Sequence, residues 1–513
     1  MVKFWYGAIC ASVVFVGAFF MFGGHMNANH SNGDTTGVEQ PANPIESLSR
    51  APNSEGDHEA KLNAIIYNIK TKNDVDPAIA AINEYAKNNP NSTEAQIYKT
   101  FVAPVKLFKG MAWRLRFLVE PVDAAYIASI SYLRAFKRNS DRRAPHLDAL
   151  FDYATEPNPG ENIAGQTGVF KTAAELQDFM ATKVAVAVKA QNEAYKAILT
   201  KHGNNDAPLF NFDAGLILGE GEVKNSASQT MRFRKFMPGH LKGLMANMYE
   251  RMGFGMYIAS YDLEGLQYFM NTLTARSLVA KKGNLDTKTS IGKNLVTTVF
   301  DVHLQSPKEI SELLSSMSKA PANDKKAKFL TLRPAAKAGN YLNESLTAIR
   351  NAVNYRIEAH KDMEVLAKKG NQREYFANAD FLTSRPAITL AALEKRRKLL
   401  YSNGPTDFKD RVDNSNFNVN ISALFNPKNP YVNDLKKLYP APNHFAATKE
   451  TDGGPRETFK WNYDYGTPQA WPDVTFAGVL PNTSSPADYK KKLVSISRDA
   501  STPALTYWLR LFM

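Results

Sequence analysis

Carboxylate side chains that lie close together along the chain are its best candidates for acid–base chemistry. Glu220 and Glu222 lie two residues apart in a turn-like stretch, LILGEGEVK, and Asp213 lies shortly before them. Two carboxyl groups that meet across a cleft could cleave a glycosidic bond, one acting as acid and the other as base or nucleophile. Such residues more often cap helices through their side-chain oxygens. The sequence therefore keeps a hydrolase site as an alternative.

Other catalytic motifs are incomplete in this sequence. Ser316 and Lys319 have the Ser-x-x-Lys spacing of penicillin-recognising enzymes, but no Lys-Thr-Gly accompanies them. Residues 283–293, GNLDTKTSIGK, have glycines nine positions apart rather than five, and Asn294 stands where a phosphate loop needs a hydroxyl. The nine His residues include no pair four positions apart, so a local zinc motif is absent. We expect no cofactor, no metal and, on balance, no catalysis.

An aromatic cluster near the C-terminus is a candidate binding surface. Trp461, Tyr463, Tyr465 and Trp471 could form a platform that stacks against a sugar or a peptide. The alternative is that these side chains pack in the core, which is the commoner place for large aromatic residues. Core packing is the interpretation that we favour.

A second candidate surface mixes aromatic residues with cations. Residues 101–122, FVAPVKLFKGMAWRLRFLVEPV, have the composition of an amphipathic helix at a membrane surface. Trp113 and Phe117 would enter the headgroup boundary, while Arg114 and Arg116 would meet lipid phosphates. The alternative is a buried helix pair, broken near its two prolines, whose cations reach solvent at the ends. We favour the buried pair because a glycine interrupts the apolar stripe.

A helical hairpin near the start of the folded body is the third candidate surface. Residues 59–92, EAKLNAIIYNIKTKNDVDPAIAAINEYAKNNPNS, place apolar residues at three- and four-residue steps on two short helices, and Pro90 closes the second. This segment resembles a tetratricopeptide repeat, although Ile66 and Tyr85 stand where the family prefers small residues. The resemblance implies a unit that stacks on neighbouring helices, because one repeat cannot bury its own apolar face.

The hairpin also implies a partner. A repeat of this family would bind a peptide or a helix on its concave side, and we expect that contact to use Asn63, Tyr67, Lys70 and Tyr85. The alternative is a generic helical hairpin that only packs against the rest of the body.

The elements that must position all these residues are mainly helices. Apolar residues recur with helical spacing from residue 58 to about residue 400, and Gly, Asn and Pro clusters end most of the periodic stretches. The fold class is therefore mainly α, a helical-hairpin or solenoid-like exported body with an irregular, aromatic- and Pro-rich C-terminal segment. The longer predicted helices cover 173–199, 241–259, 263–280, 291–304, 310–317, 335–367 and 388–400.

Composition divides the chain into five parts. Residues 4–24 carry no formal charge and are long enough to span a bilayer, which predicts a transmembrane signal-anchor helix after a cytoplasmic N-terminus at 1–3. Residues 25–57 are rich in Asn, Ser, Gly and Pro, which predicts a flexible linker. A mainly helical region follows at 58–403. We expect the irregular segment 404–513 to pack against it.

Charge and cysteine usage predict the location. Lys3 precedes the apolar run and no Lys or Arg follows it until Arg50, so the positive-inside bias places the bulk of the chain outside the cytoplasm. The one cysteine, Cys10, lies within the apolar run, so the exported part can form no disulfide, which favours a bacterial periplasm. We expect a single-pass inner-membrane protein. The alternative is a cleaved signal and a soluble exported protein.

The net charge of +13 is compatible with an anionic partner. The interpretation that we favour is that the basic residues form solvated helix faces and loops scattered over the surface. Because an exported protein does not meet nucleic acid, we expect an envelope protein, an anionic polymer or lipid headgroups instead. The predicted function is a membrane-anchored envelope scaffold or binding protein that presents its helical domain to a protein or cell-wall partner. The alternatives are an envelope hydrolase acting on peptidoglycan or glycan, and a lipid-handling membrane-surface protein, which a large apolar cavity between helices would indicate.

Overall fold

The computed structural model describes the chain in segments that begin at residue 54. The described residues are 54–114, 145–155, 170–218, 233–269, 272, 307–368, 374–376, 389–409, 415–439, 445–450, 458–463, 473–485, 487–489, 491–492 and 495. Most of this part is helical, so the mainly α prediction is confirmed, while export and a solenoid-like arrangement stay predictions.

Several predicted segments lie outside the described residues. They include the anchor at 4–24, nearly all of the linker at 25–57, and the helix predicted at 291–304. Of the helix predicted at 263–280, only the start is described, with helical residues at 266–269. Within the described residues, no helix combines the length and the apolar character that crossing a bilayer requires.

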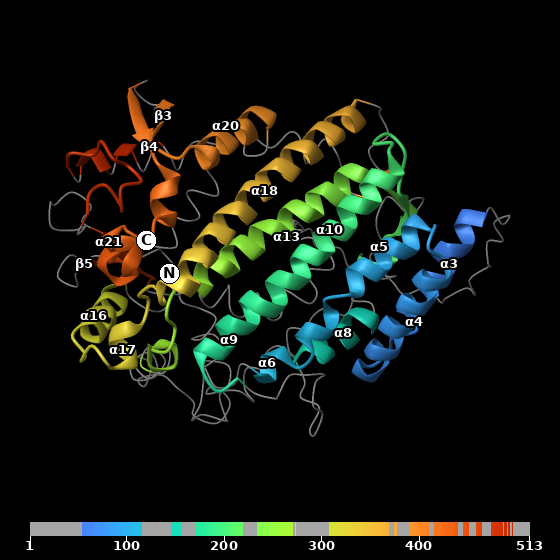
Figure 1. Ribbon diagram of the computed structural model, residues 1–513, viewed down its shortest axis with the longest axis horizontal. Coiled ribbons are helices and arrows are strands. Elements are labelled where there is room, and N and C mark those ends of the chain that lie inside the picture. Colours follow the sequence, from blue (N-terminus) through green and yellow to red (C-terminus); the bar gives the residue numbers. More distant parts are fainter. Residues whose placement is uncertain are drawn as a thin grey trace.

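Three long helical segments lie side by side in the middle of the molecule (Figure 1). One begins as α9 (Ala173–Phe179), continues through a π-helical turn (Met180–Val184) and ends as α10 (Ala185–His202). The second, α13 (Pro238–Ala259), packs against α10 and also against the third, α18 (Ala335–Ala367). All three lie where the spacing of apolar residues predicts helices.

The ends of these helices carry residues that helix ends prefer. The Thr172 hydroxyl accepts a hydrogen bond from the Glu175 amide, 3.2 Å away, at the start of α9. Pro238 opens α13, where its missing amide proton has no intrahelical partner to lose. Gly203 ends α10 with a φ of 68°, a left-handed conformation that suits glycine. These local preferences explain where the helices begin and end.

Helices α13 and α18 approach closely at Gly253. A Cβ atom at this position would lie 2.6 Å from Ile349 Cγ1 and 3.1 Å from the Ser345 carbonyl oxygen. The Ser345 hydroxyl donates to the Gly253 carbonyl, 2.6 Å away, and Tyr249 stacks on Tyr355 with 5.8 Å between ring centroids. Glycine costs helix propensity in mid-helix, so its presence here follows from the packing of the two helices.

A layer of shorter elements lies against α10 on the side away from α13 (Figure 1). In this layer α5 packs on α10, and α3 and α4 pack on α5, so the predicted hairpin at 59–92 is present as a helix pair. Its family resemblance stays a prediction. The elements of the layer are α3 (Ser54–Tyr67), η2 (Lys72–Asp74), α4 (Val75–Asn88), α5 (Thr93–Val102), η3 (Val105–Phe108), α6 (Met111–Arg114), α8 (Pro145–Thr155), α11 (Gly215–Leu218) and the antiparallel pair β1 (Phe210–Asp213) and β2 (Phe233–Phe236).

The C-terminal elements lie on the other side of α18 (Figure 1). Helix α20 and the 3-10 helix η9 pack against α18, and Phe476 and Tyr489 are fully buried in the continuous core. Packing of the whole segment 404–513 on the helical body stays a prediction. Two elements that precede α18 in the chain, α16 (Pro307–Ser318) and α17 (Lys325–Lys328), lie on the same side. The C-terminal elements are α20 (Leu390–Tyr401), β3 (Thr406–Lys409), β4 (Asn416–Val419), η9 (Ile421–Phe425), α21 (Pro430–Asn433), η10 (Leu435–Leu438), β5 (Phe445–Glu450) and β6 (Thr458–Tyr463).

Candidate binding cavity

An apolar cavity of about 60 Å³ lies within the layer of short helices. Ile66 and Ile69 of α3 line it, as do Ala78, Ile79 and Ile82 on the inner face of α4. The apolar spacing that predicts the two helices therefore also builds this wall. This wall faces the neighbouring elements of the layer, and the cavity is the space between the hairpin and those elements.

The rest of the wall comes from elements that follow later in the chain. The cavity is also lined by Phe101 of α5, Phe212 of β1 and Leu216 of α11. Only two of the lining side chains, Tyr98 and His146, carry a polar atom. A water molecule needs two to four polar partners, so a wall of this composition suits an apolar group better than water.

Helix α8 contributes His146, one of the two polar residues of the wall. His146 is 1% exposed. Its Nε2 lies 2.7 Å from the Leu216 carbonyl oxygen. Because a carbonyl can only accept, Nε2 carries the proton of this bond. The other ring nitrogen, Nδ1, is buried without a hydrogen-bond partner among the residues that the structure describes. Burial lowers the pKa of His146, which favours the neutral ring.

Tyr98 is the second polar residue of the wall and comes from α5. Its hydroxyl donates a hydrogen bond to Asn63 Oδ1, 2.8 Å away. Burial raises the pKa of Tyr98 well above its ordinary value, and the carboxylates of Glu94, Glu59 and Asp213 raise it further. The phenol therefore stays protonated at physiological pH and cannot act as a base.

Three buried carboxylates gather around Tyr98 but do not line the cavity. Glu59, Glu94 and Asp213 are all at least nine-tenths buried, and none is among the lining residues. Both Asp213 oxygens accept hydrogen bonds, Oδ1 from the Gly215 amide at 2.8 Å and Oδ2 from the Tyr67 hydroxyl at 2.9 Å. Asp213 thus ties α3 and α11 to β1, which matches the capping alternative. Its predicted companions, at 220 and 222, lie outside the described residues.

The four residues predicted to bind a partner do not share one free face. Asn63 is 6% exposed and Tyr67 half-buried, and both point toward inner partners through the bonds given above. Tyr85 is half-buried, with its hydroxyl 2.6 Å from His58 Nδ1. Lys70 is exposed, and its amine donates to the Tyr67 carbonyl. Partner binding therefore stays a prediction, and of the four only Lys70 is exposed.

Arg114, predicted for the membrane surface, lies in the interior. It is 3% exposed, and its guanidinium lies over the rings of Phe170 and Phe179, 4.3 and 4.7 Å from their centroids. Burial lowers its pKa to about 10. This position agrees with the alternative of buried helices. The side chain of Trp113 is not described, and 116 and 117 lie outside the described residues.

The predicted aromatic platform is only partly described. Trp461 and Tyr463 belong to β6, where their backbones pair with Ala447 and Phe445 of β5. They are two positions apart, so they share a face of this hairpin. Positions 465 and 471 lie outside the described residues, and the platform stays a prediction.

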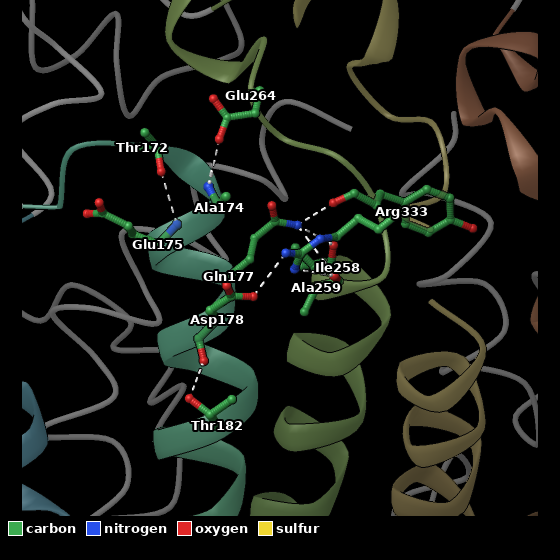
Figure 2. A network of polar contacts seen from close by, with 11 residues as sticks. Thr172, Ala174, Glu175, Gln177, Asp178, Thr182, Ile258, Ala259, Glu264 and Arg333 are labelled. Atoms are coloured by element: carbon green, nitrogen blue, oxygen red, sulfur yellow. Dashed lines mark hydrogen bonds and ion pairs between the residues drawn. The ribbon is translucent and has the colours of Figure 1, made fainter. Parts of the chain in front are cut away.

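A second polar network joins α9 to the C-terminal end of α13, and Figure 2 shows it. The Gln177 amide donates to the Tyr261 carbonyl and more weakly to those of Ile258 and Ala259, both at 3.5 Å. Arg333 donates to the Ala259 carbonyl at 3.5 Å and pairs with the Asp178 carboxylate at 2.9 Å. These donors satisfy the free carbonyls of a helix end, so the network holds the fold together.

No protein-family model matches this chain, and no curated protein or solved structure matches it either.

Proposed function

We propose that the protein is a membrane-anchored binding protein without catalytic activity, which holds part of an acyl chain or of a similar apolar molecule in the cavity. This proposal joins the predicted binding role to the lipid-handling alternative. The observation that carries it is the wall of the cavity, which is apolar except at Tyr98 and His146. Burying a ligand CH₂ group there is worth about 0.8 kcal/mol.

The volume of the cavity is large enough for only a short segment of a ligand. About 60 Å³ is roughly four times the ~15 Å³ that one water molecule requires. Such a space takes a few CH₂ groups or a small ring, and not a whole lipid. The rest of the ligand would lie outside the cavity.

The described carboxylates near the cavity do not form the paired site that the hydrolase alternative requires. A glycosidase needs two carboxyl groups that face a shared cleft. Glu59, Glu94 and Asp213 lie behind the wall, and both oxygens of Asp213 are engaged in hydrogen bonds. This arrangement supports binding over cleavage.

The predicted anchor at 4–24 fits the same role, because it would keep the body beside a membrane that supplies acyl chains. The partners predicted from the sequence, an envelope protein or an anionic polymer, would then receive the ligand or lie beside it. We propose this wider role on the sequence alone.

Photocrosslinking of the full-length protein in its own membranes tests the proposal. The probe is 1-dodecanol with a diazirine at mid-chain, and the adducts are located by peptide mass spectrometry. We expect saturable adducts on the lining residues Ile79, Ile82 and Phe101. Adducts confined to the predicted anchor, or adducts that do not saturate, would contradict the proposal.

A matched pair of variants on α4 controls this experiment. Ala78→Leu places its added bulk in the cavity, whereas Ala81→Leu adds the same bulk at an exposed position. Excluding about two ligand CH₂ groups at ~0.8 kcal/mol each should lower the yield of cavity adducts roughly tenfold for Ala78→Leu. Ala81→Leu should keep the wild-type yield.

A further inference from the structure

Lysine side chains gather where two segments far apart in the sequence meet, on the opposite side of the three long helices from the cavity (Figure 1). The buried amine of Lys436 in η10 donates to the carbonyl oxygens of Ala327, 3.0 Å away, and of Phe329, so η10 lies against the end of α17. Helix α16 contacts both elements. These elements and their ends carry a set of lysines that we call the lysine surface: Lys319, Lys325, Lys326, Lys328 and Lys437.

The carboxylates of this region are bound to groups of the fold. Asp324 accepts a hydrogen bond from the Lys326 amide, 2.8 Å away, at the start of α17. Asp434 pairs with the buried amine of Lys436 at 3.0 Å. Glu264 accepts a hydrogen bond from a backbone amide of α9 at 3.2 Å. All three acids are half-buried, so their carboxylates hold the elements together while the lysine amines remain at the surface.

The amines of the lysine surface are accessible to solvent. The Lys325 side chain is 69% exposed although it lies 3.1 Å from Glu264, and an ion pair so exposed contributes little. Three other members are exposed and form no ion pair with any residue that the structure describes: Lys319, Lys328 and Lys437. Glu312 of α16 is exposed as well and offsets one of these charges. The positive charge is therefore in excess.

An exposed tyrosine lies beside these lysines. The amine of Lys326 lies 4.2 Å from the centroid of the Tyr268 ring, and Tyr268 is 38% exposed. A tyrosine has an apolar ring and a polar hydroxyl, which suits the boundary between lipid headgroups and acyl chains.

We propose that the lysine surface docks on a bilayer that carries anionic phospholipid, with the lysines at the lipid phosphates and Tyr268 at the headgroup boundary. This inference goes beyond the proposed function, because the lysine surface shares no residue with the wall of the cavity. The charges of the two surfaces are complementary. Each lysine near an anionic bilayer strengthens binding roughly fivefold.

The side-chain types favour lipid over a protein partner. Lysine is depleted in protein interfaces, whereas arginine is enriched there. The fork of an arginine also holds a fixed carboxylate or phosphate better, whereas lysine carries a hydrated point charge on a flexible stem, which suits mobile headgroups. All five cations of the lysine surface are lysines. The anchor predicted at 4–24 would keep them beside a bilayer.

Acetylation of lysines by sulfosuccinimidyl acetate, read by peptide mass spectrometry, tests the docking in full-length protein reconstituted in lipid nanodiscs. One set of nanodiscs contains phosphatidylcholine alone, and the other contains phosphatidylglycerol as well. We expect Lys328 and Lys437 to react roughly fivefold more slowly in the nanodiscs with phosphatidylglycerol. Lys87 of α4 and Lys196 of α10 are exposed on other parts of the body and should react at equal rates in both.

A charge reversal and a matched control identify the residues responsible. Lys328→Glu combined with Lys437→Glu should abolish the protection of Lys325, because attraction to the bilayer becomes repulsion. Lys87→Glu combined with Lys196→Glu changes the net charge equally and should keep that protection. Urea unfolding checks that both variants fold. If the first does not fold, wild-type protein decides, since its protection should disappear at about 1 M salt, where the Debye length is only about 3 Å.

The outcomes separate this inference from the proposed function. Equal rates for Lys328 and Lys437 in the two kinds of nanodisc overturn the docking, as does equal protection of Lys87. Protection by soluble polyglutamate, without protection by phosphatidylglycerol, would assign the surface to an anionic polymer and also overturn it. The adducts in the cavity are measured separately. Protected lysines without cavity adducts would overturn the proposed function alone.

Discussion

The Tyr67 hydroxyl lies 2.9 Å from Asp213 Oδ2, although 146 positions separate the two residues in the sequence. This bond joins the end of α3 to the end of β1, and the Tyr67 ring lies edge-on to His146 with 5.4 Å between centroids. It fixes the positions of two walls of the cavity relative to each other, so its loss should lower both the free energy of unfolding and the affinity for a ligand.

Tyr67→Phe should lower the free energy of unfolding by about 1–2 kcal/mol, because Asp213 then loses a hydrogen-bond donor in a buried site. Urea unfolding of the full-length protein in nanodiscs measures the change. Tyr268→Phe is the control, since Tyr268 is 38% exposed, and it should stay within about 0.5 kcal/mol of wild type. Equal effects of the two variants would contradict the role given to the Tyr67 bond.

Protonation of His146 makes the free energy of unfolding depend on pH. Burial is the largest cause of its lowered pKa and Lys70 adds to it, while the Leu216 bond and the carboxylates of Asp213 and Asp148 act in the other direction. The unfolded chain, with a His pKa near ~6.5, therefore binds the proton more readily than the folded protein. This contribution is complete above about pH 6.5 and is lost as the pH falls through the folded pKa.

Urea midpoints between pH 8 and pH 5 test this sign. The wild-type midpoint should fall toward pH 5, and His146→Gln should show a shallower fall because the titrating ring is gone. His202→Gln should keep the wild-type slope. A slope in His146→Gln as steep as in wild type would show that the ring does not titrate against folding.

Two glycines of α13 should respond oppositely to alanine. Gly253→Ala places a Cβ 2.6 Å from Ile349 Cγ1, so it should cost about 1–3 kcal/mol of stability through overpacking. At Gly243 the nearest atom to a new Cβ is Ala359 Cβ at 4.0 Å, an ordinary contact. Gly243→Ala should therefore stabilise the protein by about 0.4–1 kcal/mol through the unfolded state. Urea unfolding measures both, and stabilisation by Gly253→Ala would refute the close approach of α13 and α18.

Gln177→Leu should destabilise the protein by about 1–3 kcal/mol, because it removes the donor that reaches the Tyr261 carbonyl at the buried end of α13. Thr182→Val removes an exposed hydroxyl from the same helical segment and serves as the control. Its expected effect lies within about 0.5 kcal/mol. Differential scanning calorimetry would report both, and a neutral Gln177→Leu would show that another donor replaces the amide.

Helical periodicity predicts much of the fold. The bounds of α18 agree with the predicted 335–367, because a long apolar stripe faces α13 and few breakers interrupt it. The antiparallel pair β1–β2 is not predicted in this way, since strands of four residues carry too little alternation to be recognised.

The cavity is much harder to predict than the helices around it. Its apolar wall follows from the helical spacing of Ile79 and Ile82, but nothing in the sequence around Pro145 marks the histidine that follows it as a wall residue. That role depends on Leu216, 70 positions further along, whose carbonyl fixes the ring. Contacts between distant segments decide the polar part of the site, and no local pattern encodes them.

The π-helical turn at 180–184 fixes the rotational phase between the two halves of one continuous helix. It contains one more residue per hydrogen-bonded turn than an α-helix, and each residue advances the helix by about 100°. Before the turn, Gln177 faces the end of α13; after it, Gln191 donates to the Thr100 carbonyl of α5, 2.9 Å away. Deleting a single residue here would swing one of these faces away from its neighbour, so this short stretch should tolerate substitutions far better than changes of length.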